Sequence, residues 1–226
     1  MAELVSDAAG YESVEGEPPE LLGRNLRAAA HLSAGATAFF FLAFVFAYFY
    51  LRSLNSAGMW RPKGVDPSLT LGTLMAAAVA ACAVLLRLGL ADHRAARRPQ
   101  WRLKGALALA AAITAIVLQI VEWATQGFGP ADGGYASVYL GWTAFYVLFL
   151  AATVYWLETI VATSFRYRKI GGATLEPGHA SGDPYRMAHD IADPLALVRP
   201  GLEALSMYTT FLAALGVLSW VVLYLL

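Results

Sequence analysis

The chain has 226 residues, of which 58% are hydrophobic and only 14% are charged, whereas an average soluble domain has about a quarter of its residues charged. Sixteen Lys and Arg residues balance sixteen Asp and Glu residues, so the composition offers no basic field for binding nucleic acid. A single cysteine, Cys82, excludes a disulfide framework and a cysteine-based metal site. This composition predicts a membrane protein.

The N-terminal segment 1–27 carries six acidic residues against Arg24 and Arg27 and has no early hydrophobic run, so we expect a polar tail and not a signal peptide. Five apolar blocks follow, each about as long as a bilayer crossing requires: about 31–51, 69–90, 105–125, 135–164 and 204–226. A lone strand would leave its backbone groups unpaired in lipid, so each block predicts a helix. The expected fold is all-α: a polytopic transmembrane bundle of five helices over residues 28–226.

The connections predict the orientation of the bundle. Short turns at 91–104 and 126–134 make the neighbouring helices antiparallel. Twelve of the sixteen Lys and Arg residues lie in the N-terminal tail, the 91–104 turn and the polar 165–203 segment, and three lie in the 52–68 connection. The positive-inside rule therefore predicts a cytoplasmic N-terminus and an external C-terminus.

The four histidines are unsuited to holding a buried metal. His31 lies at the cytoplasmic end of the first span, whereas His93, His179 and His189 fall in the expected polar connections. Haem and copper ligands inside a membrane protein would instead be expected near mid-membrane. We therefore expect no cofactor bound by this chain itself.

Ionisable residues inside apolar blocks are the strongest functional signal, because a charge in hydrocarbon is costly unless it is paired or neutralised. Gln119, Glu122 and Gln126 share one face of the third span. Glu122 is interpreted first as a structural tie to another helix or subunit, with a proton-carrying or ligand-binding carboxylate and a snorkelling interfacial group as alternatives. Arg87 and Glu158 lie at equivalent depths of the second and fourth spans, so they could form an ion pair or could both snorkel.

The third span and the connection after it carry a pattern of residues with a specific spacing. Gln119, Glu122 and Trp123 are followed by Asp132, Gly133, Tyr135, Ala136 and Ser137. This pattern resembles subunit III of the haem-copper respiratory oxidases, the cytochrome c oxidase subunit III family, in its five-helix bacterial form. Two further segments, 47–49 (Ala-Tyr-Phe) and 60–67 (Trp-Arg-Pro-Lys-Gly-Val-Asp-Pro), are similar to the same family.

Polar landmarks of that family are missing from this chain. The intramembrane carboxylate of the family's first span falls on Thr37, and the two histidines of its fourth span fall on Tyr146 and Phe149. A His-Phe-x-Asp pattern in the last span falls on Thr210, Phe211 and Ala213. The resemblance is therefore to a divergent member.

The resemblance implies an accessory, non-catalytic subunit of an oxidoreductase complex in the bacterial cytoplasmic membrane. Such a subunit packs on catalytic subunit I and other oxidase subunits, holds phospholipid, and supports proton uptake and enzyme lifetime, with haem and copper in the partner subunit. Structural, lipid or partner contacts are then expected at the following residues: Gln119, Glu122, Trp123, Asp132 and Tyr135. Among them, Asp132 is expected to cap the turn into the fourth span.

Three other functions remain open at this point. A subunit-III-like component of a nitric-oxide-reducing complex fits the same residues. An independent channel or transporter would use Glu122, but it needs a polar path across the whole bilayer. A membrane enzyme with its own cofactors would need His or Cys ligands at depth.

Overall fold

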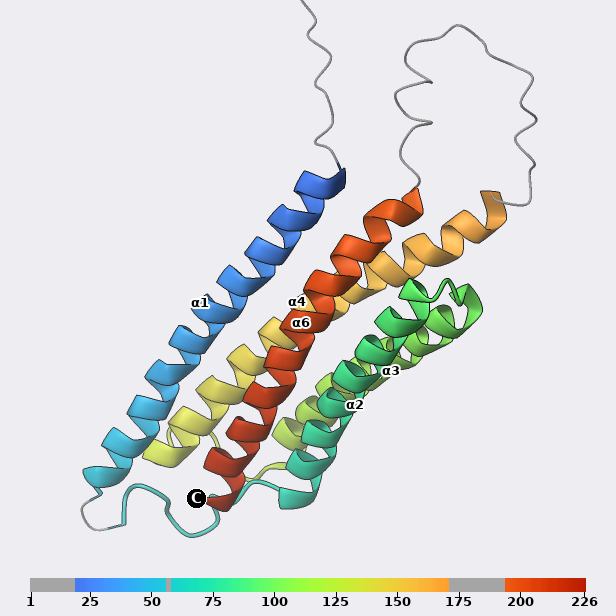
Figure 1. The fold of residues 1–226 in the computed structure, drawn as a ribbon. Helices are drawn as coiled ribbons and strands as arrows, with labels where there is room; N and C mark the ends of the chain where they lie inside the picture. The colour runs from blue at the N-terminus through green and yellow to red at the C-terminus, as the bar shows by residue number, and fades with distance from the viewer. Residues whose placement is uncertain (1–18, 56–57, 171–193) are drawn as a thin grey trace, which may run out of the picture.

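A computed structural model describes residues 19–55, 58–170 and 194–226. It contains the following helices, labelled as in Figure 1: α1 (Pro19–Ser53), α2 (Leu69–Arg94), α3 (Arg98–Thr125), α4 (Gly134–Ile170), α6 (Pro194–Trp220) and a terminal π-helical turn η2 (Val221–Leu225). Five of these helices are long and apolar enough to cross a membrane. The described part of the chain is thus an all-α, multi-pass membrane bundle, in agreement with the predicted fold class.

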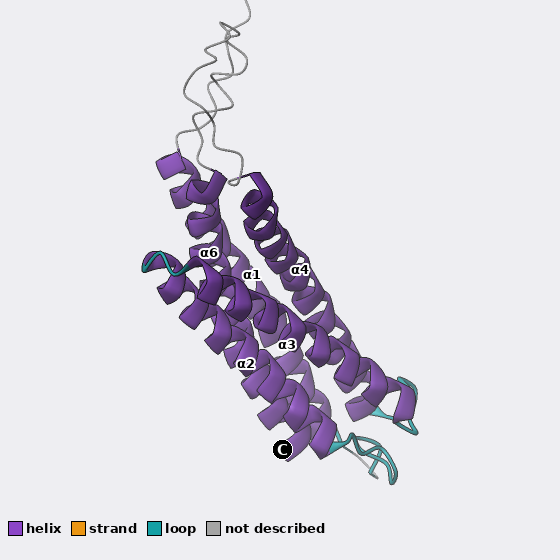
Figure 2. Ribbon diagram, turned by 90° about the vertical axis from the view of Figure 1, so that its right-hand side faces the viewer, coloured by secondary structure: helices purple, strands orange, loops and turns teal. Residues whose placement is uncertain are grey.

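The helices run alternately up and down, so that the start of α1 and the C-terminus lie at opposite ends of the bundle (Figure 1). The helix pair α2 and α3 packs side by side, and α6 contacts α1, α2 and α4. Figure 2 shows the same bundle from the side, with α4 on the far side of α3 from α2. Direct contact between α2 and α4 is therefore slight.

Each helix extends beyond the apolar block that predicted it. The expected tail at 1–27 already becomes helical at Pro19, and the expected 165–203 connection is shortened because α4 continues to Ile170 and α6 begins at Pro194. Hydropathy marks only the part of a helix that lies in hydrocarbon. Backbone hydrogen bonding continues through polar residues such as Arg24 and Arg27, so the helices continue outside that layer.

The connection predicted at 91–104 reduces to the tight turn 95–97. Ala96 adopts a left-handed backbone conformation (φ 56°), and Pro99 occupies the first turn of α3, where its missing N–H group does no harm. Asp92 is 2% exposed and forms ion pairs with Arg97 (2.8 Å) and Lys104. The basic residues of this turn therefore fasten α2 to α3.

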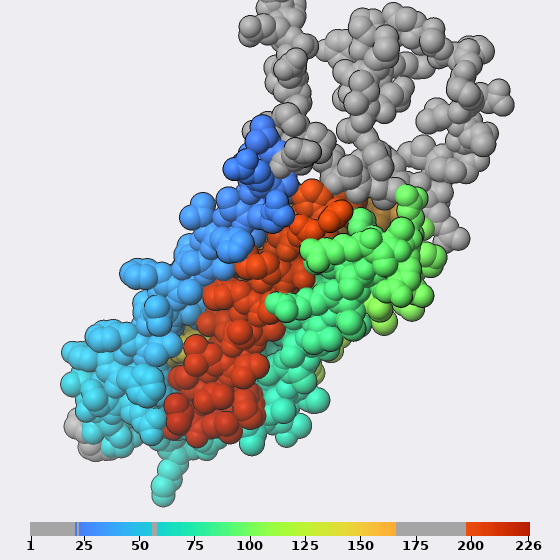
Figure 3. All heavy atoms as spheres, in the orientation of Figure 1, coloured from blue at the N-terminus to red at the C-terminus, as the bar shows by residue number. Residues whose placement is uncertain are grey.

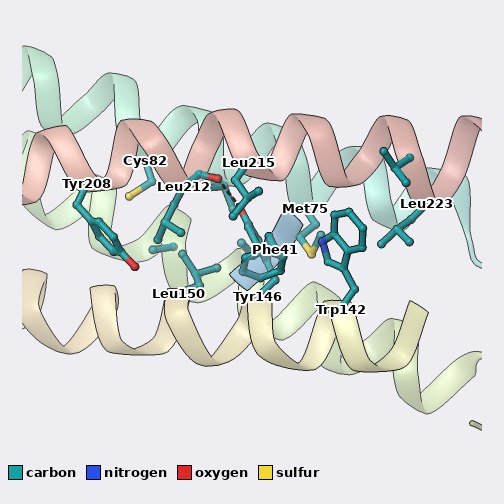
Figure 4. Close-up of a cluster of buried hydrophobic side chains, with 14 of the residues drawn as sticks. Phe41, Met75, Cys82, Trp142, Tyr146, Leu150, Tyr208, Leu212, Leu215 and Leu223 are labelled. Carbon is teal, nitrogen blue, oxygen red and sulfur yellow. Dashed lines mark hydrogen bonds between the residues drawn. The ribbon is translucent and has the colours of Figure 1, made fainter. Parts of the chain in front are cut away.

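Aromatic and aliphatic side chains fill the centre of the bundle (Figure 4). Phe41 of α1 packs against Trp142 of α4, with ring centroids 5.9 Å apart. Tyr146 donates its hydroxyl hydrogen to the carbonyl oxygen of Leu212 (2.9 Å) and thereby joins α4 to α6. Cys82 is fully buried in the same core as a free thiol, consistent with packing alone.

Candidate functional site

The buried end of α3 holds a carboxylate and an amide on one face, as the sequence predicted. Gln119 and Glu122 have exposed fractions of 0% and 1%. They lie three residues apart on the helix, and Gln119 Nε2 donates to Glu122 Oε2 over 3.2 Å. Gln126, one turn further on, is half-buried and donates to the carbonyl oxygen of Phe128 (3.4 Å).

Two tyrosines from other elements complete a hydrogen-bonded group that we name the Glu122 cluster: Gln119, Glu122, Tyr139 and Tyr224. Tyr224 of η2 donates its hydroxyl hydrogen to Glu122 Oε2 (2.7 Å). The Tyr139 hydroxyl of α4 lies 3.2 Å from that of Tyr224 and accepts from Gln119 Nε2 (3.5 Å). One carboxylate therefore joins α3 to η2 directly and to α4 through Tyr139.

The start of α2 makes room for this cluster. A Cβ atom at Gly72 would lie 2.4 Å from the ring of Tyr224, so only glycine lets the tyrosine reach Glu122. The backbone of Ser68, the residue that caps α2, also lies against the Glu122 carboxylate. The positive end of a helix dipole favours a carboxylate at such a position. Four elements therefore meet at Glu122.

The cluster also has unused hydrogen-bonding capacity. Glu122 Oε1 and Gln119 Oε1 are buried and accept no hydrogen bond from the protein, and the same holds for Gln126 Oε1. Buried acceptors are normally satisfied, because an unpaired polar atom in an apolar surrounding is costly. Chemically, this arrangement can hold a proton or a water molecule in addition to tying helices together.

The other residues of the predicted pattern lie nearby at the same end of the bundle. Trp123 donates from Nε1 to Thr143 Oγ1 of α4 (3.0 Å). Tyr135 is fully buried and donates its hydroxyl hydrogen to the carbonyl oxygen of Leu223 in η2. The guanidinium of Arg61 lies 4.5 Å from the centre of the Tyr135 ring. Both aromatic residues therefore join separate elements of the bundle.

Asp132 stabilises the turn in the connection before α4. Its Oδ2 accepts from the backbone N–H of Gly129 (2.6 Å), within the connection 126–133. The next residue, Gly133, has a φ of +133°, and a Cβ atom there would lie 2.8 Å from Pro62 Cδ. The connection therefore packs closely against the segment 59–62, which requires glycine at this position.

Arg87 and Glu158 are not brought together. Arg87 Nε donates to Thr210 Oγ1 of α6 (2.9 Å), whereas Glu158 is exposed on α4 and has no ion pair within the described ranges. The physical reason is the packing order, since α2 contacts α3 and α6 and hardly touches α4.

The positions at which the sequence departs from the resembled family hold mainly hydroxyl groups that bond within the bundle. Thr37 is 2% exposed, and its Oγ1 lies 3.1 Å from the hydroxyl of Tyr208 on α6. Tyr146 and Thr210 bond to the Leu212 carbonyl and to Arg87, as described above. These positions therefore contribute helix contacts.

The two histidines within the described residues make local contacts. His31 Nδ1 lies 2.7 Å from the carbonyl oxygen of Arg27, and His93 packs beside Trp101. His179 and His189 lie outside the described residues. In the parts of the chain that the structure describes, no three His, Cys, Asp or Glu side chains gather as a metal site would require.

Sequence reasoning missed Tyr139, Tyr224 and Gly72 as parts of the Glu122 cluster. A buried carboxylate in lipid needs hydrogen-bond donors, and tyrosines in the other apolar blocks were candidates. Only the packing of the helices shows which tyrosines lie within hydrogen-bonding distance of Glu122. No known family model and no curated protein matches this chain. The candidate site therefore rests on the geometry of the residues in this chain.

Proposed function

We propose that this chain is the accessory subunit III of a haem-copper terminal oxidase in aerobic respiration. In this role it binds no haem or copper itself, packs on the catalytic subunit, holds phospholipid, and supports proton uptake and the lifetime of the enzyme. Oxygen reduction belongs to the partner subunit, which would contain the haem and copper centres.

The observation that carries the proposal is the ungapped pattern from Gln119 to Ser137. Its members resemble subunit III in both residue type and spacing. They lie at the same end of the bundle, and each forms a hydrogen bond to another helix: Glu122 bonds to Tyr224, Trp123 to Thr143 and Tyr135 to Leu223. A structural role for these residues fits an accessory subunit, whose task is to hold a fixed shape against a partner.

The surface of the bundle supports partner and lipid contacts. The side chains of Phe39, Phe46 and Phe49 on α1 are 80%, 69% and 47% exposed. On the opposite side of α1, a groove of about 540 Å³ separates it from α4 and is lined by residues that include Thr37, Phe149 and Trp156. Helix association in lipid depends on close packing and not on the hydrophobic effect. Exposed aromatic rings and an open groove offer surfaces for that packing and for acyl chains.

The proposal includes a location and an orientation. The distribution of Lys and Arg supports a cytoplasmic N-terminus, and the family resemblance supports a bacterial cytoplasmic membrane. An independent transporter is less well supported, because the Glu122 cluster lies at one end of the bundle and α3 itself provides no further carboxylate toward its start.

Removing the chain from its native cells tests the proposal. We expect the oxidase that lacks this chain to retain its haem absorption bands, to take up protons more slowly, and to lose activity sooner during turnover. Supplying the intact chain in trans should restore the rate of proton uptake and the lifetime of the activity. Loss of nitric oxide reduction with normal oxygen reduction would instead assign the chain to a nitric-oxide-reducing complex. Unchanged respiration on either acceptor would refute the proposal.

A further inference from the structure

Three arginines from three helices converge on one carboxylate at the end of the bundle where α1 begins. Glu203 of α6 accepts from Arg94 Nη2 of α2 (3.0 Å), from Arg27 Nη1 of α1 (3.3 Å) and from Arg199 Nε on its own helix (3.4 Å). Each arginine side chain is more than half exposed, whereas that of Glu203 is 15% exposed. The guanidinium groups therefore lie outside the carboxylate and present their remaining N–H donors outward.

A fourth arginine continues this group toward the membrane interior. Arg87 lies seven residues before Arg94 on α2, and Thr210 lies seven residues after Glu203 on α6, so the two contacts are stacked two helical turns apart. Arg87 forms no ion pair within the described residues, because its Nε bonds to a neutral hydroxyl. Three guanidinium groups thus share a single carboxylate, and Arg87 adds a fourth positive charge nearby, which leaves a local surplus of positive charge.

We name these four arginines the arginine face: Arg27, Arg94 and Arg199 contact Glu203, and Arg87 lies two helical turns deeper on α2. Arg27, Arg94 and Arg199 stand at the ends of the candidate spans Gly23–Ser53, Leu69–Arg94 and Val198–Leu225. Helices α1, α6 and α2 lie side by side in the space-filling view (Figure 3). This is the depth at which phospholipid headgroups surround a membrane protein.

We propose that the arginine face binds the phosphate headgroup of an anionic phospholipid. Guanidinium groups match phosphate oxygens with paired N–H donors, and arginine is less strongly hydrated than lysine, which favours binding at the membrane interface. Basic residues at this depth attract anionic lipid, and clusters between helices bind its headgroups. The inference adds a ligand class and a place to the lipid role in the proposed function, and it needs only that the chain spans a membrane.

The test measures lipid retained by the full-length chain, purified in mild detergent with whatever subunits accompany it, by native mass spectrometry. Phosphatidylglycerol and phosphatidylcholine of equal chain length serve as the anionic and zwitterionic probes. We expect selective retention of phosphatidylglycerol, weakened about fivefold by Arg94→Gln and by Arg87→Gln. Arg52→Gln, which removes the same charge at the opposite end of α1, is the matched control and should change nothing.

The variant Glu203→Gln separates a lipid site from a purely structural ion-pair cluster. Removing the competing carboxylate should increase phosphatidylglycerol retention severalfold if the guanidinium groups bind an anionic headgroup. Reduced or unchanged retention in Glu203→Gln, or equal retention of the two lipids by the unmodified chain, would overturn the inference. Full displacement by millimolar inorganic phosphate would also overturn it, because the site would then select free phosphate.

Two other occupants appear as distinct outcomes of the same experiment. An acidic segment of a partner protein would co-purify in place of lipid, and its loss in Arg94→Gln would refute the lipid assignment. Occupation of the arginine face by the chain's own acidic residues in 1–18 would also refute it, and would appear as phosphatidylglycerol retention that occurs only after those residues are replaced by Ser and Ala. Neither result depends on whether an oxidase co-purifies, so failure here is distinguishable from failure of the proposed function.

Discussion

Replacing Glu122 tests the structural role of the Glu122 cluster. Glu122→Ala removes the acceptor of two hydrogen bonds, from Tyr224 and from Gln119, at a site that is 1% exposed. Each hydrogen bond between helices in a membrane contributes on average about 0.6 kcal/mol and at most about 1.7 kcal/mol. The lost Cγ methylene group and the cavity left behind add about 1 kcal/mol or more. We therefore expect Glu122→Ala to lower the free energy of unfolding by about 2–4 kcal/mol.

Glu122→Gln should cost less than about 1 kcal/mol, because the amide oxygen still accepts from Tyr224 and the side chain keeps its volume. Thermal unfolding of the purified chain in detergent measures the difference. For a chain of this size, the alanine variant should lose about 5–15 °C in Tm and the glutamine variant only about 1–3 °C. Glu158→Ala, which removes an exposed carboxylate without an ion pair, is the control and should leave Tm unchanged.

Equal destabilisation by alanine and glutamine would refute the hydrogen-bond reasoning, as would a neutral alanine variant. The same pair separates structure from proton transfer within the assembled complex. If Glu122→Gln kept full assembly and stability but lost turnover, the carboxyl group would be a proton carrier and the structural interpretation would be insufficient.

Three further changes have calculable outcomes. Gly72→Ala should displace Tyr224 from Glu122, because its Cβ would lie 2.4 Å from the ring, and should cost about 1–3 kcal/mol in detergent unfolding; a neutral effect would show that Tyr224 can shift freely. Trp123→Phe should cost about 1 kcal/mol through loss of the bond to Thr143, and no change in the denaturation midpoint would contradict that bond. Asp92→Ala should destabilise the α2–α3 turn by about 1–3 kcal/mol and expose it to protease, because Arg97 and Lys104 lose their buried acceptor; protease resistance equal to that of the unmodified chain would be inconsistent with this ion-pair network.

The sequence was informative about everything that depends on local composition. Solid apolar blocks of bilayer length predict helices because lipid permits no unpaired backbone, and all five helices are present. The exact helix ends were not predictable in this way. Pro19 and Ile170 lie beside charged residues, where hydropathy carries no signal but helical hydrogen bonding continues. Pro194 precedes the apolar run 195–198, which is too short to indicate a bilayer crossing.

The candidate site was predictable only within one helix. Spacing alone placed Gln119 and Glu122 on one face of α3, because helical periodicity is a local property. Tyr224 lies about 100 positions away along the chain, and its arrival depends on the absence of a side chain at Gly72. The Arg87–Glu158 pair illustrates the same limit, since equal depth in the membrane says nothing about which helices are neighbours. Hydropathy indicates how deep a residue lies in the membrane, whereas helix packing determines which helices are neighbours.

The most direct test of the proposed function is the purification of a tagged chain from its native membranes under gentle conditions, with a visible absorption spectrum and identification of the co-purified subunits. An accessory subunit of a haem-copper oxidase predicts haem bands and a large catalytic subunit in constant proportion to this chain. A colourless preparation containing only this chain, alone or self-associated, would contradict the proposal and would make Glu122 with its unpaired Oε1 the leading candidate for a substrate-binding group.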